Sequence, residues 1–355
     1  AGGTSANPDL SISMKPGGPN YIDQTTTTTT LDSYIQKGQD IDAEATGDEF
    51  GHSVALNAYG TVLAVGASEN DSNGTDSGHA RVYAWDSSAN SGAGDWVQRG
   101  PDFDGDAAYD YYGWSVDLSS DGTIVAIGAK RSDFSGVTDS DVGHVEVHEW
   151  SGTGWNQLGN DILGEANYDY DGHSVSLSAN GHVFAVGAIL NDPPGQNANT
   201  GHVRVHEWNG SSWSQRGSDF DGASGAAIGS AVALNADGTI LAIGCPDDQA
   251  QGHVRVYKWE NSAWSQMGLN IDGNSTSDMS GAAVALSDDG MILAVGEPFY
   301  DQPAQSAGRV RVYTYDASAG WALRGQGIEG TGGSSQAGSS VDISADGAFV
   351  TFTEI

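Results

Sequence analysis

The chain has 355 residues, with 47 acidic against 13 basic side chains and a formal net charge of −34 at pH 7. This charge excludes a nucleic-acid-binding role, because affinity for phosphates comes from Lys and Arg that neutralise the backbone and release counterions. Few aliphatic residues together with a high charge would fit a disordered chain, but 51 Gly, 13 Tyr and 10 Trp in a strongly periodic sequence indicate a fold rich in tight turns.

The N-terminal residues 1–23 contain several Pro and Gly and predict an irregular arm. The threonine run from Thr25 to Thr30 suits a β-strand, and an O-glycosylated tail is the open alternative. Tyr34 to Gly38 (YIQKG) is the first of six copies of a short motif. No stretch of the sequence reaches the roughly 18 apolar residues that a membrane helix needs, so we expect no membrane insertion. The single cysteine, Cys245, lies in an apolar run and is expected to be buried.

Three sequence motifs recur along the chain in a fixed order. The first, GHSVALNAYGTVLAVGA at 51–67, begins again at Gly113, Gly172, Gly229, Gly281 and Gly338, which spaces the copies 52 to 62 residues apart. The second, GHVRVHEW at 201–208, occurs in five copies, and the third, WSQRG at 213–217, in six. Self-similarity at such a period is the signature of a repeat architecture.

Each repeat contains four short apolar segments, which we name a, b, c and d, separated by Gly, Asn, Asp and Ser. Segments a and c alternate polar and apolar residues, as half-buried strands do, while b is continuously apolar, as a strand covered on both faces would be. Four-stranded antiparallel sheets repeated in this way bury their faces by packing around an axis, so the sequence predicts an all-β, six-bladed β-propeller. The blades are expected at about 48–100, 110–159, 169–217, 226–268, 278–325, and 335–355 together with 24–38.

Both ends of the chain are expected to build the sixth blade. The last repeat stops after segments a and b, whereas Tyr34 to Gly38 is a d segment without a repeat of its own. We therefore expect residues 24–38 to add strands to the C-terminal half-blade and close the ring, because closure removes exposed sheet edges. Residues 24–355 then form one propeller domain that follows the arm at 1–23.

Large aromatic residues mark the ends of segment c and the beginnings of segment d. They are expected to pack between blades in the wide outer part of the propeller, since each buries about 150–250 Å². These positions are Tyr34, Trp85, Trp96, Trp150, Trp155, Trp208, Trp213, Trp259, Trp264 and Trp321.

The residues FGHSV at 50–54, LAVGA at 63–67 and GHARVY at 78–83 resemble the FG-GAP family of propeller repeats, whose wider group includes the heads of integrin α-subunits. The similarity extends over about residues 34–355 and is nearest to the tandem-repeat variant of algal and bacterial proteins. It implies extracellular or surface roles in adhesion and recognition, usually without catalysis. The calcium sites of integrin-type repeats are not expected here, because the a–b connections, such as Asn57 to Gly60, are short hairpin turns.

The connections from d to a carry most of the acidic residues. Oxygen-rich clusters suit Ca²⁺, which accepts about six to eight ligands in irregular geometry, so one hypothesis is a calcium ion in at least one of these loops. The alternative is that the carboxylates are solvated or cap turns. The candidate ligands are Asp42, Glu44, Asp48, Asp102, Asp104, Asp106 and Asp110.

Histidines recur at two repeat positions, and repetition in several blades indicates a scaffold role. His79, His144, His202 and His253 stand at the start of c, and His52 and His173 at the start of a. The sequence contains no nucleophile elbow, phosphate loop or zinc-ligand spacing. We therefore expect no enzyme activity and no cofactor other than the Ca²⁺ considered above.

The leading interpretation is a non-enzymatic interaction or structural module of an extracellular or cell-surface assembly, with an organelle lumen as the alternative location. The b–c and d–a loops share one rim, which is expected to bind a protein or a glycan. Two other hypotheses are a calcium-dependent lectin and a carbohydrate-active enzyme that uses rim carboxylates such as Asp104 and Asp110. Sequons at Asn73, Asn209 and Asn274 would permit N-glycosylation. The chain is expected to belong to a larger assembly or a longer protein.

Overall fold

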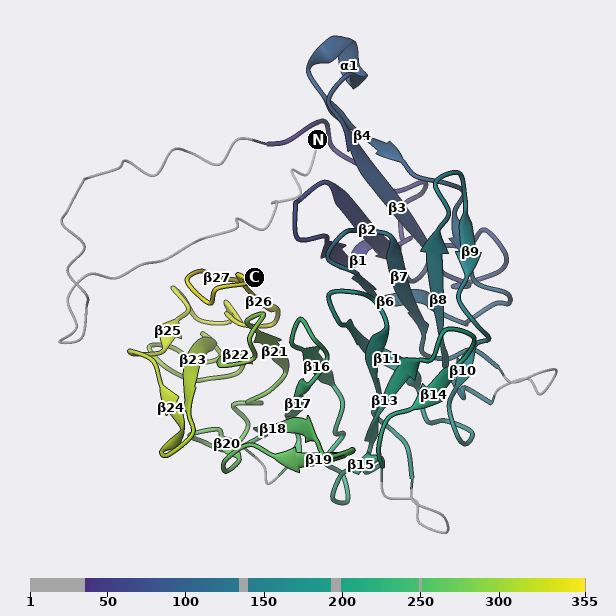
Figure 1. Cartoon of the computed structure of the whole chain (residues 1–355). Helices are drawn as coiled ribbons and strands as arrows, with labels where there is room; N and C mark the ends of the chain where they lie inside the picture. Colours follow the sequence, from purple (N-terminus) through teal and green to yellow (C-terminus); the bar gives the residue numbers. More distant parts are fainter. Residues whose placement is uncertain (1–35, 134–139, 193–198, 249–250, 355) are drawn as a thin grey trace.

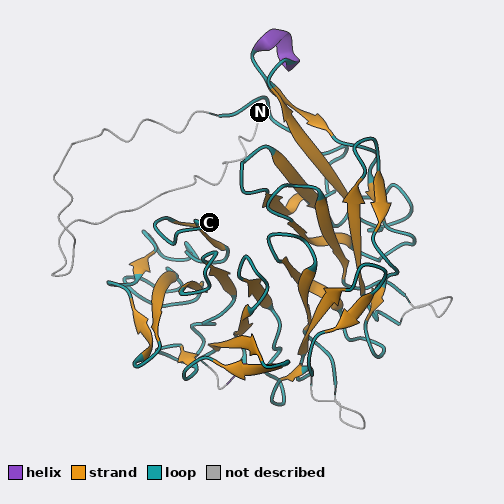
Figure 2. Ribbon diagram, in the orientation of Figure 1, coloured by secondary structure: helices purple, strands orange, loops and turns teal. Residues whose placement is uncertain are grey.

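The computed structural model describes residues 36–133, 140–192, 199–248 and 251–354, and β-strands dominate it (Figure 2). Blade 1 contains β1 (Phe50–Leu56), β2 (Val62–Ala67), β3 (His79–Asp86), β4 (Asp95–Gln98) and β5 (Phe103–Asp104), with the single-turn helix α1 (Ala89–Gly92) between β3 and β4. Blade 2 contains β6 (Tyr112–Leu118), β7 (Ile124–Ala129), β8 (His144–Trp150), β9 (Trp155–Gln157) and β10 (Ile162–Leu163). Blade 3 contains β11 (Asp171–Leu177), β12 (Val183–Ala188), β13 (His202–Trp208), β14 (Trp213–Gln215) and β15 (Phe220–Asp221).

The remaining units repeat the same plan. Blade 4 contains β16 (Ala231–Leu234), β17 (Ile240–Cys245), β18 (His253–Glu260), β19 (Ala263–Gln266) and β20 (Ile271–Asp272). Blade 5 contains β21 (Ala283–Leu286), β22 (Ile292–Glu297), β23 (Arg309–Asp316), β24 (Gly320–Leu323) and β25 (Ile328–Glu329). The C-terminal half-blade is the two-stranded sheet of β26 (Val341–Ile343) and β27 (Val350–Phe352).

Within each full blade, a pairs with b, b with c, and c with d, all antiparallel. The d strand is split in two: in blade 1, Tyr83 of β3 faces Gln98 of β4, while His79 of β3 faces Asp104 of β5. Between the two pieces the chain turns at Gly100, which has a positive φ of 95°. The predicted four-strand plan is therefore present, with its outermost strand broken in the middle.

The blades follow one another around a common centre, with the a strands innermost and the d strands outermost (Figure 1). The core lies between successive blades, where Val62 and Val82 of blade 1 pack against Val116 and Ile127 of blade 2. Every residue of β7 is buried, as a b strand covered on both faces requires. The all-β, propeller-like fold predicted from the repeats is confirmed.

Glycine allows the inner strands of neighbouring blades to approach closely. A Cβ atom added to Gly66 of β2 would lie 1.9 Å from the carbonyl oxygen of Gly113 in β6, so no larger residue fits. The a–b turns are also linked from blade to blade, as when the amide of Ala58 donates to the carbonyl of Ser120. Four further bonds of this kind join Ser120 to Ala179, Ala179 to Ala236, Ala236 to Asp288 and Asp288 to Ala345.

The sixth interface differs in the part of the chain that the structure describes. Among the described residues, no backbone hydrogen bond joins the a–b turn of the half-blade to that of blade 1. Val54 and Leu56 of β1 are 62% and 59% exposed, whereas the equivalent Val116 and Leu118 of β6 are each 6% exposed. The segment at Lys37 takes the position of an outer strand: its carbonyl accepts the indole N–H of Trp96, as Arg99 accepts that of Trp155. The closing strand expected at residues 25–30 and the aromatic residue Tyr34 lie outside the described residues.

Candidate functional site

Three aromatic rings from three blades form a row where the a strands begin, on the rim of the b–c and d–a loops. His52 of β1 lies 4.1 Å from Trp114 of β6 between ring centroids, and Trp114 lies 5.8 Å from His173 of β11. These residues occupy the same repeat position, directly after the glycine that is the second residue of each of these a strands. The blade packing therefore brings together side chains that are about 60 residues apart in sequence.

Lys130 adds a cationic group to this row. It follows directly after β7, and its Nζ lies 2.6 Å from the centroid of the Trp114 ring, which makes a cation–π contact. Burial and the positive charge of Arg131 lower the pKa of Lys130 to about 7, although Glu49 and Glu69 raise it. The ammonium and the neutral amine of Lys130 are therefore both accessible near neutral pH. The equivalent residues of blades 1, 3, 4 and 5 are Ser68, Ile189, Pro246 and Pro298.

His52 is held by a carboxylate. Its Nδ1 lies 3.2 Å from Oε2 of Glu49, and its side chain remains 26% exposed. Burial lowers the pKa of His52, Glu49 opposes this, and Lys130 lowers it further, so the imidazole is neutral at pH 7. The equivalents of Glu49 in the other blades are Tyr111, Tyr170, Ala227, Met279 and Gln336, so the pair of Glu and His is specific to blade 1.

His173 is not equivalent to His52, although it shares its repeat position. Burial, helped by Lys130 and His52, lowers the pKa of His173 to about 4, and its Nδ1 is buried without a hydrogen-bond partner. His52 is therefore the member of the row that can exchange protons with solvent. A neutral imidazole oriented by a carboxylate can act as a general base, and an adjacent ammonium can stabilise an oxyanion.

The acidic residues predicted as metal ligands lie in different environments. Asp48 accepts the backbone N–H of Ala45 and the amide of Asn70, and Asp110 accepts the N–H of Ala107. Both carboxylates are buried, and burial raises the pKa of Asp110. They hold the d–a turn in place through hydrogen bonds from backbone amides and, for Asp48, from the side chain of Asn70.

Glu44 and Asp102 are the two predicted ligands that the structure brings together. Both bond to the guanidinium of Arg81, with Asp102 at 2.7 Å, and an atom of each lies within 4.8 Å of a ring nitrogen of His79. Arg81 lowers the pKa of Asp102. The other three predicted ligands are exposed: Asp42, Asp104 and Asp106.

The outer aromatic residues form cross-strand pairs within each blade, such as Trp85 opposite Trp96 at 5.5 Å. The second member also reaches the preceding blade, since the indole N–H of Trp213 donates to the carbonyl of Leu158 at 2.6 Å. All three sequon asparagines are exposed and already hydrogen-bonded. Asn73 donates to Gly105, Asn209 donates to Ser212, and Asn274 accepts from Arg311.

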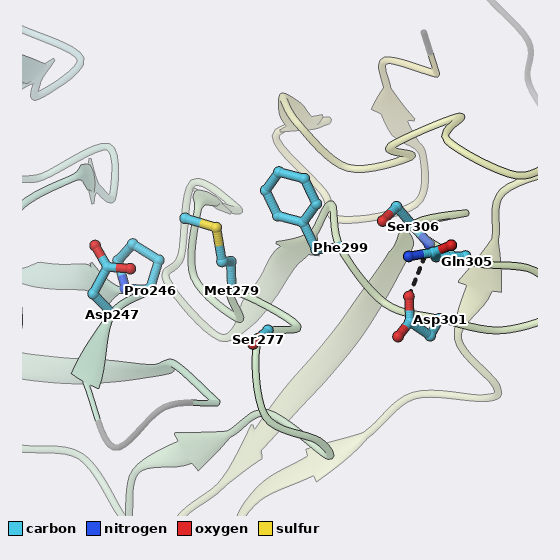
Figure 3. A pocket seen from close by; sticks show the side chains of 8 residues that line it. All are labelled: Pro246, Asp247, Ser277, Met279, Phe299, Asp301, Gln305 and Ser306. Atoms are coloured by element: carbon cyan, nitrogen blue, oxygen red, sulfur yellow. Dashed lines mark hydrogen bonds between the residues drawn. The ribbon is translucent and has the colours of Figure 1, made fainter.

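A shallow hollow of about 380 Å³ lies on the same rim between blades 4 and 5 (Figure 3). Pro246, Met279 and Phe299 supply its apolar lining, and Asp247 and Asp301 its carboxylates. It contains no histidine or lysine, so it offers neither a base nor a cation for chemistry. The arrangement suits contact with an apolar face and hydroxyl groups of a ligand.

Fold and site together define a propeller-like repeat protein with a cluster of a histidine, a lysine and a glutamate at its inner rim. Residues 42–83 match the family model of the FG-GAP repeat, which confirms the resemblance seen in the sequence. A search of curated protein sequences finds no significant match. Among the described residues, no helix has the length and apolar character needed to cross a membrane.

Solved structures with a similar fold include three that are described as lactonases. They are a proposed 6-phosphogluconolactonase from Bacteroides uniformis (12% identity, TM-score 0.54, 85% of this chain and 77% of that one), another from Bacteroides fragilis (13%, 0.54, 88% and 78%) and the periplasmic gluconolactonase of Pseudomonas aeruginosa (17%, 0.52, 84% and 77%). At these identities the likeness is one of fold.

These neighbours contradict the prediction of a non-enzymatic module, and they favour the carbohydrate-active alternative. The expectation of no enzyme activity is contradicted by the same neighbours, all three of which are described as lactonases. It rested on the regularity of the repeats, but repeat consensus specifies the scaffold, whereas function depends on individual side chains placed on it.

Reasoning from sequence missed His52 and Lys130. His52 was assigned to the scaffold because His173 shares its position, and Lys130 lies outside the repeated motifs. The usable signal was Glu49 three residues before His52, a combination that the other blades lack.

Proposed function

We propose that the protein is a hydrolase of carbohydrate lactones, with His52, Glu49 and Lys130 as its reacting groups. The observation that carries the proposal is the Glu49–His52 pair, 3.2 Å apart and partly open to solvent, beside a lysine whose pKa is about 7. The lactonase descriptions of propellers with a similar fold support the class of substrate. The reacting groups differ from the rim carboxylates Asp104 and Asp110 of the sequence-based hypothesis.

In the reaction that we propose, Nε2 of His52 takes a proton from water while the water oxygen attacks the lactone carbonyl carbon. Glu49 holds the ring through Nδ1 and stabilises the imidazolium that forms. The oxyanion of the tetrahedral intermediate lies beside the ammonium form of Lys130. Collapse breaks the bond between the carbonyl carbon and the ring oxygen, which takes the proton from the imidazolium, and the product is a hydroxy acid.

The charge of the protein favours a neutral substrate. With a net charge of −34, the molecule repels anions at long range, so a phosphorylated lactone would approach slowly while an anionic product would leave readily. An uncharged sugar lactone fits this field best. A secreted or periplasmic location belongs to the same proposal, and the periplasmic gluconolactonase among the fold neighbours supports it.

The test is hydrolysis of D-glucono-1,5-lactone, followed by base uptake at constant pH and corrected for the spontaneous reaction. His52→Gln should lower kcat by about 10²–10⁴-fold, the usual contribution of a general base, and Glu49→Gln should lower it less. His182→Gln is the matched control, because His182 is exposed on the opposite, a–b rim and should not affect the rate. Hydrolysis no faster than the spontaneous rate, or full activity of His52→Gln, would overturn the proposal.

A further inference from the structure

In blades 1 to 4 the first residue of strand c is a buried histidine, and several of its ring nitrogens have no hydrogen-bond partner. His202 of β13 is 1% exposed, and its Nε2 has no hydrogen-bond partner among the described residues. His79, its equivalent in blade 1, is fully buried with neither ring nitrogen hydrogen-bonded. A buried polar group without a partner is destabilising. In blade 3 the unpartnered Nε2 faces Asp171, so the nitrogen that is available to a ligand is Nδ1, which faces Glu165.

Two carboxylates lie close to His202. One ligand atom from each of Glu165, His202 and Asp219 lies within 4.8 Å of the others. Nδ1 of His202 is 3.9 Å from Oε2 of Glu165, and Nε2 points to the other side, 3.9 Å from Oδ2 of Asp171. A metal-bound histidine commonly has this surrounding, with one nitrogen on the ion and the other facing a carboxylate.

Arg204 lies near this cluster but forms its hydrogen bonds with other groups. Nη2 of Arg204 bonds to Asp171 at 2.5 Å and to the carbonyl of Leu163 at 2.7 Å, and Nη1 stays 3.9 Å from Glu165. Asp219 accepts a hydrogen bond from the amide of Gln215. Glu165 and Asp219 therefore keep oxygens that no guanidinium covers at hydrogen-bond distance.

Blade 1 contains the equivalent cluster of Glu44, His79 and Asp102, but there the arginine bonds to the carboxylates of the cluster. Arg81 bonds to both Glu44 and Asp102, so the guanidinium already occupies an oxygen of each carboxylate. The difference follows from one position: blade 3 has Asp171 where blade 1 has Phe50. A phenyl ring cannot bind an arginine through charge, so Arg81 turns to the two carboxylates, whereas Asp171 holds Arg204 away from them.

We propose that blade 3 binds a divalent transition-metal ion, such as Zn²⁺, through Glu165, His202 and Asp219. A neutral imidazole with two carboxylates suits such an ion, whereas Ca²⁺ prefers oxygen ligands alone. Glu165 is about half exposed and can move to close the 3.9 Å separation. The negative field of the whole protein concentrates cations near the site. Blade 1 binds the ion weakly or not at all, because Arg81 would have to leave first.

Calorimetric titration of Zn²⁺ into the chelator-treated full chain tests this proposal. We expect one equivalent to bind, and Glu165→Gln to weaken the affinity at least tenfold. Glu44→Gln, the same substitution at the equivalent position of blade 1, is the matched control and should leave the affinity unchanged. Because the Glu165 side chain is about half exposed, its variant should fold normally, and circular dichroism checks this. Asp219→Asn provides a second variant with the same expected loss.

Substitution with Co²⁺ gives an independent readout, since a nitrogen and oxygen ligand set produces visible absorption that Glu165→Gln should change. Absence of saturable Zn²⁺ binding by the wild-type chain, or equal affinities of Glu165→Gln and wild type, would overturn the proposal. The site shares no residue with Glu49, His52 and Lys130. Lactone hydrolysis by the chelated protein therefore tests the proposed function separately from metal binding.

Discussion

In blade 5 a buried ion pair, Glu297 with Arg309, replaces the pair of a small residue and a histidine that the other full blades have at this position. The last residue of strand b faces the first residue of strand c in every full blade: Ala67 faces His79, Ala129 faces His144, Ala188 faces His202, Cys245 faces His253, and Glu297 faces Arg309. The carboxylate of Glu297 is fully buried and accepts Nε of Arg309 at 2.6 Å and Nη2 of Arg311. Removal of this carboxylate would therefore affect two buried cations.

We predict that Glu297→Ala destabilises the protein by about 3–5 kcal/mol, the usual effect of removing one partner of a buried ion pair. Arg309 and Arg311 are 6% and 7% exposed, so water cannot replace the lost carboxylate. Arg311 keeps the carbonyl of Asp272 at 2.8 Å and the hydroxyl of Ser280, and the larger part of the loss should come from Arg309. Against a total stability of about 5–15 kcal/mol, this change is easily measured.

The double variant Glu297→Ala with Arg309→His recreates the Ala and His pair of blades 1 to 3 and should recover about half of the lost stability. Urea denaturation followed by tryptophan fluorescence measures both variants, and urea is preferred because it does not screen charges. The reasoning is refuted if Glu297→Ala costs less than about 1 kcal/mol, the average effect of any substitution, or if the double variant is no more stable than the single one.

Burial raises the pKa of Asp117, on β6, to about 6, against the opposing effect of bonds from the amides of Leu177 and Leu118. Its folded pKa then exceeds the unfolded one near 3.8, so its contribution to stability is present below about pH 4 and is lost as the pH rises through 6. Asp117→Asn should remove the part of this loss that falls between pH 4.5 and 7.5, at most about 2 kcal/mol, when urea midpoints are compared at these two pH values. Lys130→Met should raise the pKa of His52, because the lysine lowers it, and an NMR titration of the histidines should show the shift or disprove the proximity. Gly66→Ala should destabilise the protein by more than about 2 kcal/mol, because the added methyl group would overlap the carbonyl of Gly113. Gly154→Ala, where the space is open, should have little effect, and thermal melts of both variants measure the difference.

The strands and turns could be predicted from sequence because each depends on a local pattern that six copies repeat. The apolar b strands and the short a–b turns, such as Asn57 to Gly60, lie where the pattern put them. The split of strand d was not predicted. Phe103 and Asp104 belong to a repeated stretch that was interpreted as an acidic loop, because a two-residue strand is too short to show alternation.

The candidate cluster could not be predicted, because its members come from two blades and lie far apart in the sequence. His52, Trp114 and Lys130 meet through packing between β1, β6 and the end of β7, and no sequence spacing encodes that contact. Comparison of repeats also works against such a site, since it treats a shared position as scaffold. His52 and His173 share a position but differ in exposure, in partner and in pKa.

Residues that depart from the repeat consensus are of two kinds: charged residues that form ion pairs, and a charged residue without an ion-pair partner. Glu297 and Arg309 change together and neutralise each other, and Asp171 is matched by Arg204, so these departures preserve the fold. Lys130 has no carboxylate within ion-pair distance in the described part of the chain, and its charged form is stabilised by the Trp114 ring and, at longer range, by Glu49 and Glu69. Partial burial of a cation that has no ion-pair partner reduces stability, as the lowered pKa of Lys130 indicates. Its presence in one blade alone is therefore better explained by a role in binding or catalysis than by the needs of the propeller.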